Sequence, residues 1–142
     1  MLQQPALQPF AVCVDATETS RLEALHRLDI LDTPREEAFD RLVRLIRNVY
    51  DVPIGIVSLI DAHRQWYKAV EGLDATETPR KTTFCRRVIE DPRPLIVLDA
   101  LLDPRFADNP NVTGEPYVRF YAGAPLLTSD GHAIGTICAI DT

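Results

Sequence analysis

The pair Asp130-Gly131 constrains the fold more than any other feature of this sequence. It lies in a short turn between two apolar runs, Val118–Leu127 and His132–Asp141, that contain β-branched and aromatic residues. An Asp-Gly pair between two such runs is a strong signal for a β-hairpin, because glycine adopts the positive φ that the turn demands. Both runs also contain small residues, which leave room on a strand for a helix or a ligand. We expect this hairpin to form the centre of an antiparallel sheet.

A first helix is expected upstream, from about Glu18 to Ile30. Its apolar residues Leu22, Leu25 and Leu28 form a narrow stripe, typical of a helix that touches the protein body along one seam or pairs with a copy of itself. We therefore expect a homodimer that forms through the terminal helices. Residues 1–16 contain two prolines and show no periodicity, so they are interpreted as a tail.

A second helix is expected over Pro34–Tyr50, with Thr33 as its N-cap and apolar residues at spacings of three and four. The run Ile54–Asp61 is apolar on both faces, which indicates a central strand. Gln65–Glu71 alternates as its partner, and Ile134, Thr136, Cys138 and Ile140 are expected to share one face of the last strand. The remaining segments are interpreted as a loop over Leu73–Thr82, a short helix over Thr83–Glu90, a strand over Leu95–Asp99 and a long irregular segment over Ala100–Pro116.

The order of these elements predicts an α+β domain with an antiparallel sheet. The irregular segment Ala100–Pro116 is long for a compact domain, and such segments commonly act as lids. We expect it to be the least rigid internal segment and to dock on the sheet through Leu101, Leu102 and Phe106.

Length and charge limit the functions that the chain can have. With 142 residues, of which 46% are hydrophobic, it is large enough for one core and too small for two domains. A net charge of −6 argues against a nucleic-acid or acidic-membrane partner, which an excess of Lys and Arg would bind. No run approaches the roughly 20 apolar residues of a membrane span. The start of the chain lacks the basic and apolar regions of a signal peptide, so a cytoplasmic location is expected.

The cysteines are Cys13, Cys85 and Cys138, an odd number at wide spacing. This pattern favours reduced thiols over a disulfide framework or a zinc site. We expect no disulfide among them and a core position for Cys138. Cys85 is expected near the start of a helix beside two arginines, which suits either a redox-sensing thiolate or a small buried residue. No catalytic motif or metal-binding motif is recognised elsewhere, and the sequence does not indicate which cofactor, if any, the protein binds.

Four stretches resemble a bacterial GAF domain, of the version found at the front of sensor histidine kinases and diguanylate cyclases. They are Ile30–Leu45, Val57–Cys85, Ala100–Gly114 and Val118–Asp141. The resemblance covers Glu18 to Thr142 and implies a central antiparallel sheet of five or six strands. It also implies that terminal helices lie on one face and that short helices and loops roof a pocket on the other. The chain is interpreted as a tail over residues 1–16 and a single GAF domain over residues 17–142, without the helix that leads to an output domain in that family.

The resemblance implies a non-catalytic sensory module that binds a small molecule and regulates an output domain or partner. The motif of cyclic-nucleotide-binding GAF domains is missing, and so is the cysteine-histidine pair that anchors bilins, because Arg86 follows Cys85. Strand alternation and the implied roof suggest these pocket residues: Ser58, Trp66, Lys68, Phe84, Cys85, Arg119, Tyr121 and Thr136. Arg119 and Lys68 would suit an anionic ligand. Two alternatives remain open: a cysteine-based redox enzyme or switch resembling free methionine sulfoxide reductase, and a dimerisation module without a ligand.

Overall fold

The computed structural model describes residues 17–142, and the predicted tail and Cys13 lie outside that range. Its centre is a six-stranded sheet in the order β3-β2-β1-β6-β5-β4, in which all neighbours are antiparallel. The strands are β1 (Ile54–Ile60), β2 (Arg64–Glu71), β3 (Glu77–Pro79), β4 (Leu95–Val97), β5 (Phe120–Leu127) and β6 (Ala133–Asp141). The α+β prediction is confirmed.

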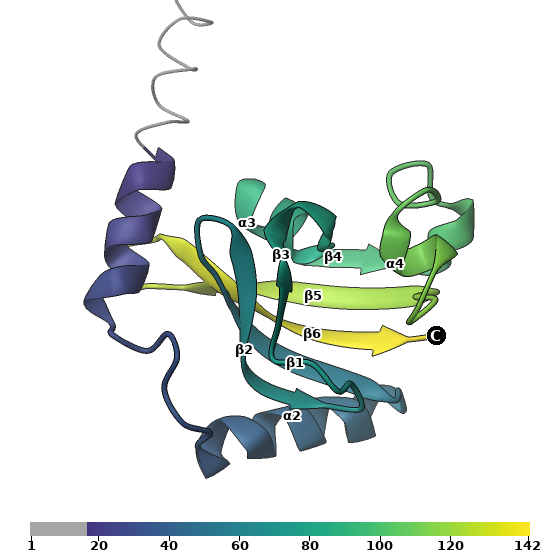
Figure 1. Ribbon diagram of the computed structural model, residues 1–142, viewed down its shortest axis with the longest axis horizontal. Helices are drawn as coiled ribbons and strands as arrows, with labels where there is room; N and C mark the ends of the chain where they lie inside the picture. The colour runs from purple at the N-terminus through teal and green to yellow at the C-terminus, as the bar shows by residue number, and fades with distance from the viewer. Residues whose placement is uncertain (1–16) are drawn as a thin grey trace, which may run out of the picture.

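Helices cover both faces of this sheet (Figure 1). A helix over residues 17–27 and α2 (Glu37–Tyr50) pack on one face, which we call the helix face. The helix α3 (Cys85–Glu90) packs on the other face, which we call the pocket face. The 3₁₀ turns η1 (Arg80–Thr82) and η2 (Ala100–Leu102) and the short α4 (Pro110–Thr113) complete the described elements.

The C-terminal hairpin forms as predicted. Gly131 has a φ of +92°, and its amide donates to the carbonyl of Thr128. The hairpin places β6 next to β1, and every residue of β1 is buried. Two adjacent central strands therefore carry the core, and both were expected from their apolar runs.

The start of α2 differs from the prediction. The helix begins at Glu37, and its N-cap residue Glu36 makes no capping side-chain hydrogen bond. The hydroxyl of Thr33 instead donates to the carbonyl of Ile30 and accepts from the Lys68 ammonium at 2.8 Å. Thr33 thus closes the turn before α2 and does not cap the helix.

A bulge in β2 changes which side chains face the pocket. Val57 of β1 pairs with Ala69, but the next residue, Ser58, pairs with Tyr67, so Lys68 is an extra residue in β2. A bulge of this kind lets two consecutive side chains turn to the same side. Lys68 therefore lies on the helix face, as Ala69 does.

A second bulge lies in β6, where Leu126 pairs with Gly135 but Leu127 pairs with Ala133. Ile134 is the extra residue, and it packs on the helix face with Leu25. The expectation that Ile134 shares a face with Thr136 is wrong for this reason. Simple alternation, on which that expectation was based, does not hold across a bulge.

The helix over residues 17–27 contacts the rest of the protein along one narrow face. Ala24 and Leu25 are buried against Leu59, Trp66 and Ile134, whereas Leu22 is half-buried and Leu28 is 52% exposed. The leucine stripe is therefore used mainly inside the chain. Among residues 17–142, no helix is long and apolar enough to cross a membrane.

Two segments expected to be irregular contain regular structure. The expected loop Leu73–Thr82 holds β3 and η1, and Ala100–Pro116 holds η2 and α4. Within the latter segment Ala100, Phe106 and Val112 are buried, whereas Leu101 and Leu102 are exposed. The segment docks through Phe106 as expected, but not through the two leucines, because η2 directs them to solvent.

Candidate functional site

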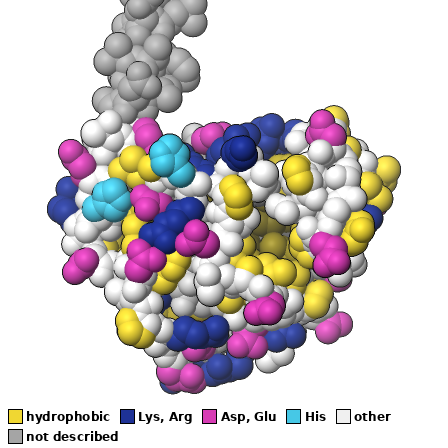
Figure 2. Space-filling view, in the orientation of Figure 1, with side chains coloured by type: hydrophobic (Ala, Val, Ile, Leu, Met, Phe, Trp, Pro, Cys, Tyr) yellow, Lys and Arg dark blue, Asp and Glu magenta, His cyan; other side chains and the backbone are white. Residues whose placement is uncertain are grey.

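A cavity of about 200 Å³ lies on the pocket face, between the central strands and a roof formed by the start of α3 and the segment around α4. On the face turned to the viewer in Figure 2, the molecule is hollowed and hydrophobic side chains form the floor of the hollow. The lining residues are Ile56, Gln65, Tyr67, Leu73, Ala75, Glu77, Thr78, Thr83, Phe84, Cys85, Asn111, Pro116, Val118, Tyr121, Cys138 and Ile140. An apolar cavity with a few polar groups is the usual form of a small-molecule site.

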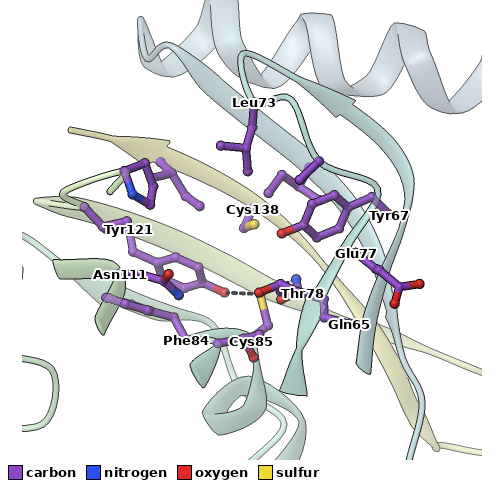
Figure 3. Close-up of a pocket in the computed structure, with 16 residues that line it drawn as sticks. Gln65, Tyr67, Leu73, Glu77, Thr78, Phe84, Cys85, Asn111, Tyr121 and Cys138 are labelled. Atoms are coloured by element: carbon purple, nitrogen blue, oxygen red, sulfur yellow. Dashed lines mark hydrogen bonds between the residues drawn. The ribbon is translucent and has the colours of Figure 1, made fainter. Parts of the chain in front are cut away.

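The sulfur of Cys85 is the chemical centre of this cavity. The Gln65 amide and the Thr136 hydroxyl each donate a hydrogen bond to Cys85 Sγ at 3.1 Å. The Tyr121 hydroxyl lies 3.1 Å from the same sulfur (Figure 3). The thiol of Cys138 lies beside it in the cavity wall and interacts with it electrostatically. Four polar groups from three strands therefore converge on one buried sulfur.

Buried polar side chains hold these donors in place. Ser58 Oγ and Thr136 Oγ1 are 3.0 Å apart, and Gln65 Nε2 also donates to Ser58 Oγ at 2.8 Å. Because the single hydroxyl proton of Thr136 is directed to Cys85, Ser58 donates to Thr136. This connected network orients each donor toward Cys85 before any ligand arrives.

The network changes the acidity of both cysteines. Burial by itself raises the pKa of the Cys85 thiol, but the hydrogen bonds from Cys138, Thr136, Tyr121 and Gln65 more than offset it, and the pKa falls below its ordinary value. The interaction with Cys85 and burial raise the pKa of the Cys138 thiol. Burial likewise raises the pKa of Tyr121. Of this group, Cys85 is the one whose deprotonation the surroundings favour.

Aromatic stacking joins the roof to this centre. The ring of Phe84 stacks on Phe106 with centroids 4.1 Å apart and tilts against Tyr121 at 5.2 Å. The side-chain amides of Asn109 and Asn111 both donate to the carbonyl of Thr82, at 3.0 and 3.1 Å. The segment Ala100–Pro116 therefore flanks the cavity, and it is anchored to the residues just before α3.

Three of the predicted pocket residues line the cavity, namely Phe84, Cys85 and Tyr121. Ser58 and Thr136 lie directly beneath it and orient the Cys85 donors.

Trp66, Lys68 and Arg119 do not line the cavity, so the expectation that they face it is wrong. Trp66 packs with Leu25 on the helix face. The Lys68 ammonium is buried among Thr33, the Pro34 carbonyl and Glu36, at 2.8, 2.5 and 2.7 Å. The Arg119 guanidinium donates to the carbonyls of Val112 and Val118 at 3.0 Å and so supports the roof.

Gln65, Tyr67 and Cys138 are pocket residues that the sequence did not indicate. Gln65 and Tyr67 lie on the same face of β2, before the bulge at Lys68. The prediction assigned the other face of β2, with Trp66 and Lys68, to the pocket, and it therefore left out Gln65 and Tyr67. Cys138 was expected in the core, and it is both buried and part of the cavity wall. Its contact with Cys85 arises because α3 packs on β6, and no spacing in the sequence signals that packing.

The side chains of residues 17–142 offer no group of three or more His, Cys, Asp or Glu that could hold a metal ion.

Comparison with known proteins agrees with this fold. The family model described as "GAF domain" matches residues 34–142. A cyclic di-GMP phosphodiesterase of Pseudomonas aeruginosa is 43% identical over 124 residues, which cover 87% of this chain. The chain spans only 21% of the length of that relative.

Solved structures show the same architecture. A GAF domain from A. aeolicus in an inactive state superposes with a TM-score of 0.57 at 13% identity, covering 90% of this chain and 81% of that one. The free methionine-R-sulfoxide reductase of Neisseria meningitidis gives a TM-score of 0.59 at 16% identity, covering 87% and 72%. This chain belongs to the GAF domain family, and it is a signalling module.

Proposed function

We propose that this GAF domain is a sensory and regulatory module that binds a small molecule in the cavity beside Cys85 and has no catalytic function of its own. The observation that carries the proposal is the cavity itself. It is lined by apolar side chains and by a few oriented polar groups, and its roof is a separate segment that could respond to an occupant.

The ligand that suits this cavity is small and uncharged. Its volume of about 200 Å³ is below the range typical of drug-sized ligands. Glu77 is the one charged residue among those that line it, and its carboxylate is engaged by Arg64 at 2.9 Å. The preference for an anionic ligand depended on Arg119 and Lys68, which do not line the cavity.

The output lies in an attached domain or a partner. The match with a cyclic di-GMP phosphodiesterase over about a fifth of its length supports an output in cyclic di-GMP signalling. An attached kinase or diguanylate cyclase would likewise be regulated by ligand binding in the cavity. The chain functions as a homodimer, in which Leu28, the residue directly after the helix over residues 17–27, contributes to the interface.

A cysteine enzyme resembling free methionine sulfoxide reductase is the second candidate. The specific observation in its favour is that the Cys85 and Cys138 thiols interact in the cavity wall. The substrate of such an enzyme is an amino acid with a carboxylate, and the charged group at this cavity is the carboxylate of Glu77. None of the lining residues is a cation that could pair with that carboxylate, so the sensory function is placed first. A dimerisation module without a ligand fits less well, because the interior contains a cavity.

Native mass spectrometry of protein purified from its own host tests the sensory function. We expect a co-purified small molecule that leaves when Ala75, a half-buried cavity residue, is replaced by tryptophan (Ala75→Trp). The matched control is Ala62→Trp at the exposed β1–β2 turn, which should retain the molecule. Release by both variants, or no bound molecule in any preparation, would contradict the proposal. Turnover of free methionine-R-sulfoxide by the wild-type chain would favour the second candidate.

A further inference from the structure

Two cysteines that are distant in the sequence meet in the wall of the cavity. Cys85 is the first residue of α3, and Cys138 lies in the central strand β6. Both are free thiols, and both are fully buried from bulk solvent while lining the cavity. In Figure 3 their sulfur atoms lie on the same side of the sheet, between Tyr67 and Tyr121.

The surroundings of Cys85 Sγ favour a thiolate at that atom. Gln65 Nε2 and Thr136 Oγ1 donate to it, and Tyr121 and Cys138 each have a proton to donate. A thiolate accepts hydrogen bonds strongly, whereas a neutral thiol is a weak acceptor. A small hydrophobic core residue does not need four polar neighbours. The network is therefore built for a nucleophilic sulfur.

The cavity selects what can reach this sulfur. It holds about 200 Å³, its walls are mainly apolar, and its one charged side chain is an acidic one, Glu77. Small neutral molecules enter such a space at a lower desolvation cost than ions do. Hydroperoxides are small, are neutral near pH 7 and react with thiolates.

We propose that Cys85 and Cys138 form a peroxide-responsive dithiol, in which Cys85 is oxidised by a small hydroperoxide and Cys138 resolves the product as a disulfide. In the first step Cys85 Sγ attacks the distal peroxide oxygen, a sulfur–oxygen bond forms, and the O–O bond breaks. The leaving alkoxide takes up the proton that the thiol had released. In the second step Cys138 Sγ attacks the Cys85 sulfenic acid, and hydroxide leaves with the Cys138 proton as water. The net reaction converts two thiols and ROOH into one disulfide, ROH and H₂O.

The disulfide would alter the roof directly. It joins the first residue of α3 to β6 and converts the thiol that Thr136, Gln65 and Tyr121 now contact into a neutral disulfide sulfur, which accepts hydrogen bonds only weakly. Phe84 precedes Cys85 and stacks on Phe106, so a shift of Cys85 is transmitted to the segment Ala100–Pro116. The inference uses the same cavity as the proposed function, but it requires no bound ligand and can be tested separately.

The experiment uses the full chain with Cys13→Ser, which leaves the two described cysteines. Reduced protein is mixed with tert-butyl hydroperoxide or H₂O₂, quenched with an alkylating reagent and analysed by intact and peptide mass spectrometry. We expect the loss of two hydrogen atoms and a cross-linked peptide pair containing Cys85 and Cys138. In Cys138→Ser we expect a dimedone adduct on Cys85, and in Cys85→Ser neither product.

A pair of tyrosine variants tests the role of the network. Tyr121→Phe removes a hydroxyl that contacts Cys85 Sγ, and its oxidation should be slower by about tenfold, the value of one hydrogen bond to a charged group. Tyr67→Phe removes a hydroxyl from the same cavity and should oxidise at the wild-type rate, because the structure shows no hydrogen bond between Tyr67 and Cys85 within the described residues. Circular dichroism of each variant establishes that it is folded.

The proposal is overturned if folded wild-type protein forms no Cys85–Cys138 disulfide. It is also overturned if Cys85 reacts no faster than Cys85 in urea-unfolded protein, or if the two tyrosine variants slow oxidation equally. Normal peroxide oxidation in a protein that binds no small molecule would refute the sensory function alone. Ligand binding without peroxide oxidation would refute the dithiol alone.

Discussion

The carboxylate of Glu18 accepts a hydrogen bond of 2.7 Å from Arg80, and this contact links the first described helix to the residues just before α3. Arg21 holds the same carboxylate at 2.9 Å and also donates to the Ile60 carbonyl at 2.7 Å. A movement of the cavity roof at Cys85 therefore has a short polar connection to the helix on the opposite face of the sheet. Contacts of this kind are what a signal from the cavity to the first described helix would require.

Glu18→Gln tests the strength of this connection through its pH dependence. Burial raises the pKa of Glu18, but the hydrogen bonds from Arg21 and Arg80 outweigh it and lower the pKa from 4.5 to about 2. A lowered folded-state pKa gives stability that is complete above pH 4.5 and is lost as the pH falls through about 2. Because Glu18 is partly exposed, we expect a loss of about 1 kcal/mol at pH 7 in urea denaturation.

The difference between wild type and Glu18→Gln should shrink steadily as the pH falls from 4.5 toward 2. Glu23→Gln, an exposed position on the same helix, serves as the control and should change stability little at any pH. A Glu18→Gln effect that stays constant over this range would show that the carboxylate charge is not what stabilises the contact.

Leu25→Ala tests the packing of the same helix. Leu25 has no exposed surface and contacts the cluster that contains Leu59 and Trp66. Its truncation leaves a cavity, and we expect the free energy of unfolding to fall by about 2–5 kcal/mol. Leu28→Ala removes the same atoms from a side chain that is 52% exposed, so the two variants should differ by more than about 1 kcal/mol in chemical denaturation. Equal effects would mean that the helix does not pack as described.

Lys68→Met tests the assignment of Lys68 to the helix face. The substitution removes hydrogen bonds to Thr33, Pro34 and Glu36, and we expect a loss of about 1–3 kcal/mol in the free energy of unfolding. Occupancy of the cavity by the co-purified molecule should not change. The control is Lys81→Met at the chain's other lysine, which is exposed. It should change neither the free energy of unfolding nor the occupancy of the cavity. Loss of the molecule from folded Lys68→Met protein would place Lys68 at the ligand after all.

Asn111→Ala tests the anchoring of the roof. In the free protein we expect amides of Ala100–Pro116 to exchange orders of magnitude faster than those of Ile54–Ile60, and to slow when the cavity is filled. The substitution removes one of two amide hydrogen bonds to the Thr82 carbonyl, so exchange in that segment should accelerate further, by about tenfold. Asp108→Ala, an exposed change in the same segment, is the control. Core-like protection throughout the segment in the free protein would contradict a role as a lid.

Leu28→Asp tests the proposed homodimer. Light scattering at roughly tens of micromolar should give a dimer for the wild-type chain, the range expected for a modest interface. A charge at the exposed Leu28 should shift it toward the monomer while leaving the circular dichroism spectrum unchanged. The control is Leu102→Asp in η2, at a side chain that is 81% exposed and belongs to the cavity roof segment. A wild-type monomer at that concentration would remove the support for pairing through this helix.

The sequence by itself determined the features that depend on local chemistry. Asp130-Gly131 specified the hairpin turn, because Gly131 adopts a positive φ that other residues rarely tolerate. The continuous apolar run in β1 indicated a strand buried on both faces. The apolar stripe of α2 indicated a helix on the sheet, but of that stripe only Val43 is buried, and Leu42, Val49 and Tyr50 are exposed. Cys85 was placed at a helix start, and Phe84, Cys85 and Tyr121 were correctly assigned to the cavity wall.

The tertiary structure decided which side chains meet in the cavity. The bulges at Lys68 and Ile134 reverse the alternation within β2 and β6, and a bulge arises from strand pairing that the residues of one strand do not reveal. For that reason Tyr67 faces the cavity and Lys68 faces α2. The meeting of Cys85 with Cys138 has the same origin, because it results from the packing of α3 on β6 between segments distant in the chain. A local pattern can specify a turn or a strand, but a cavity wall assembled from distant strands exists only after the sheet has formed and its register is set.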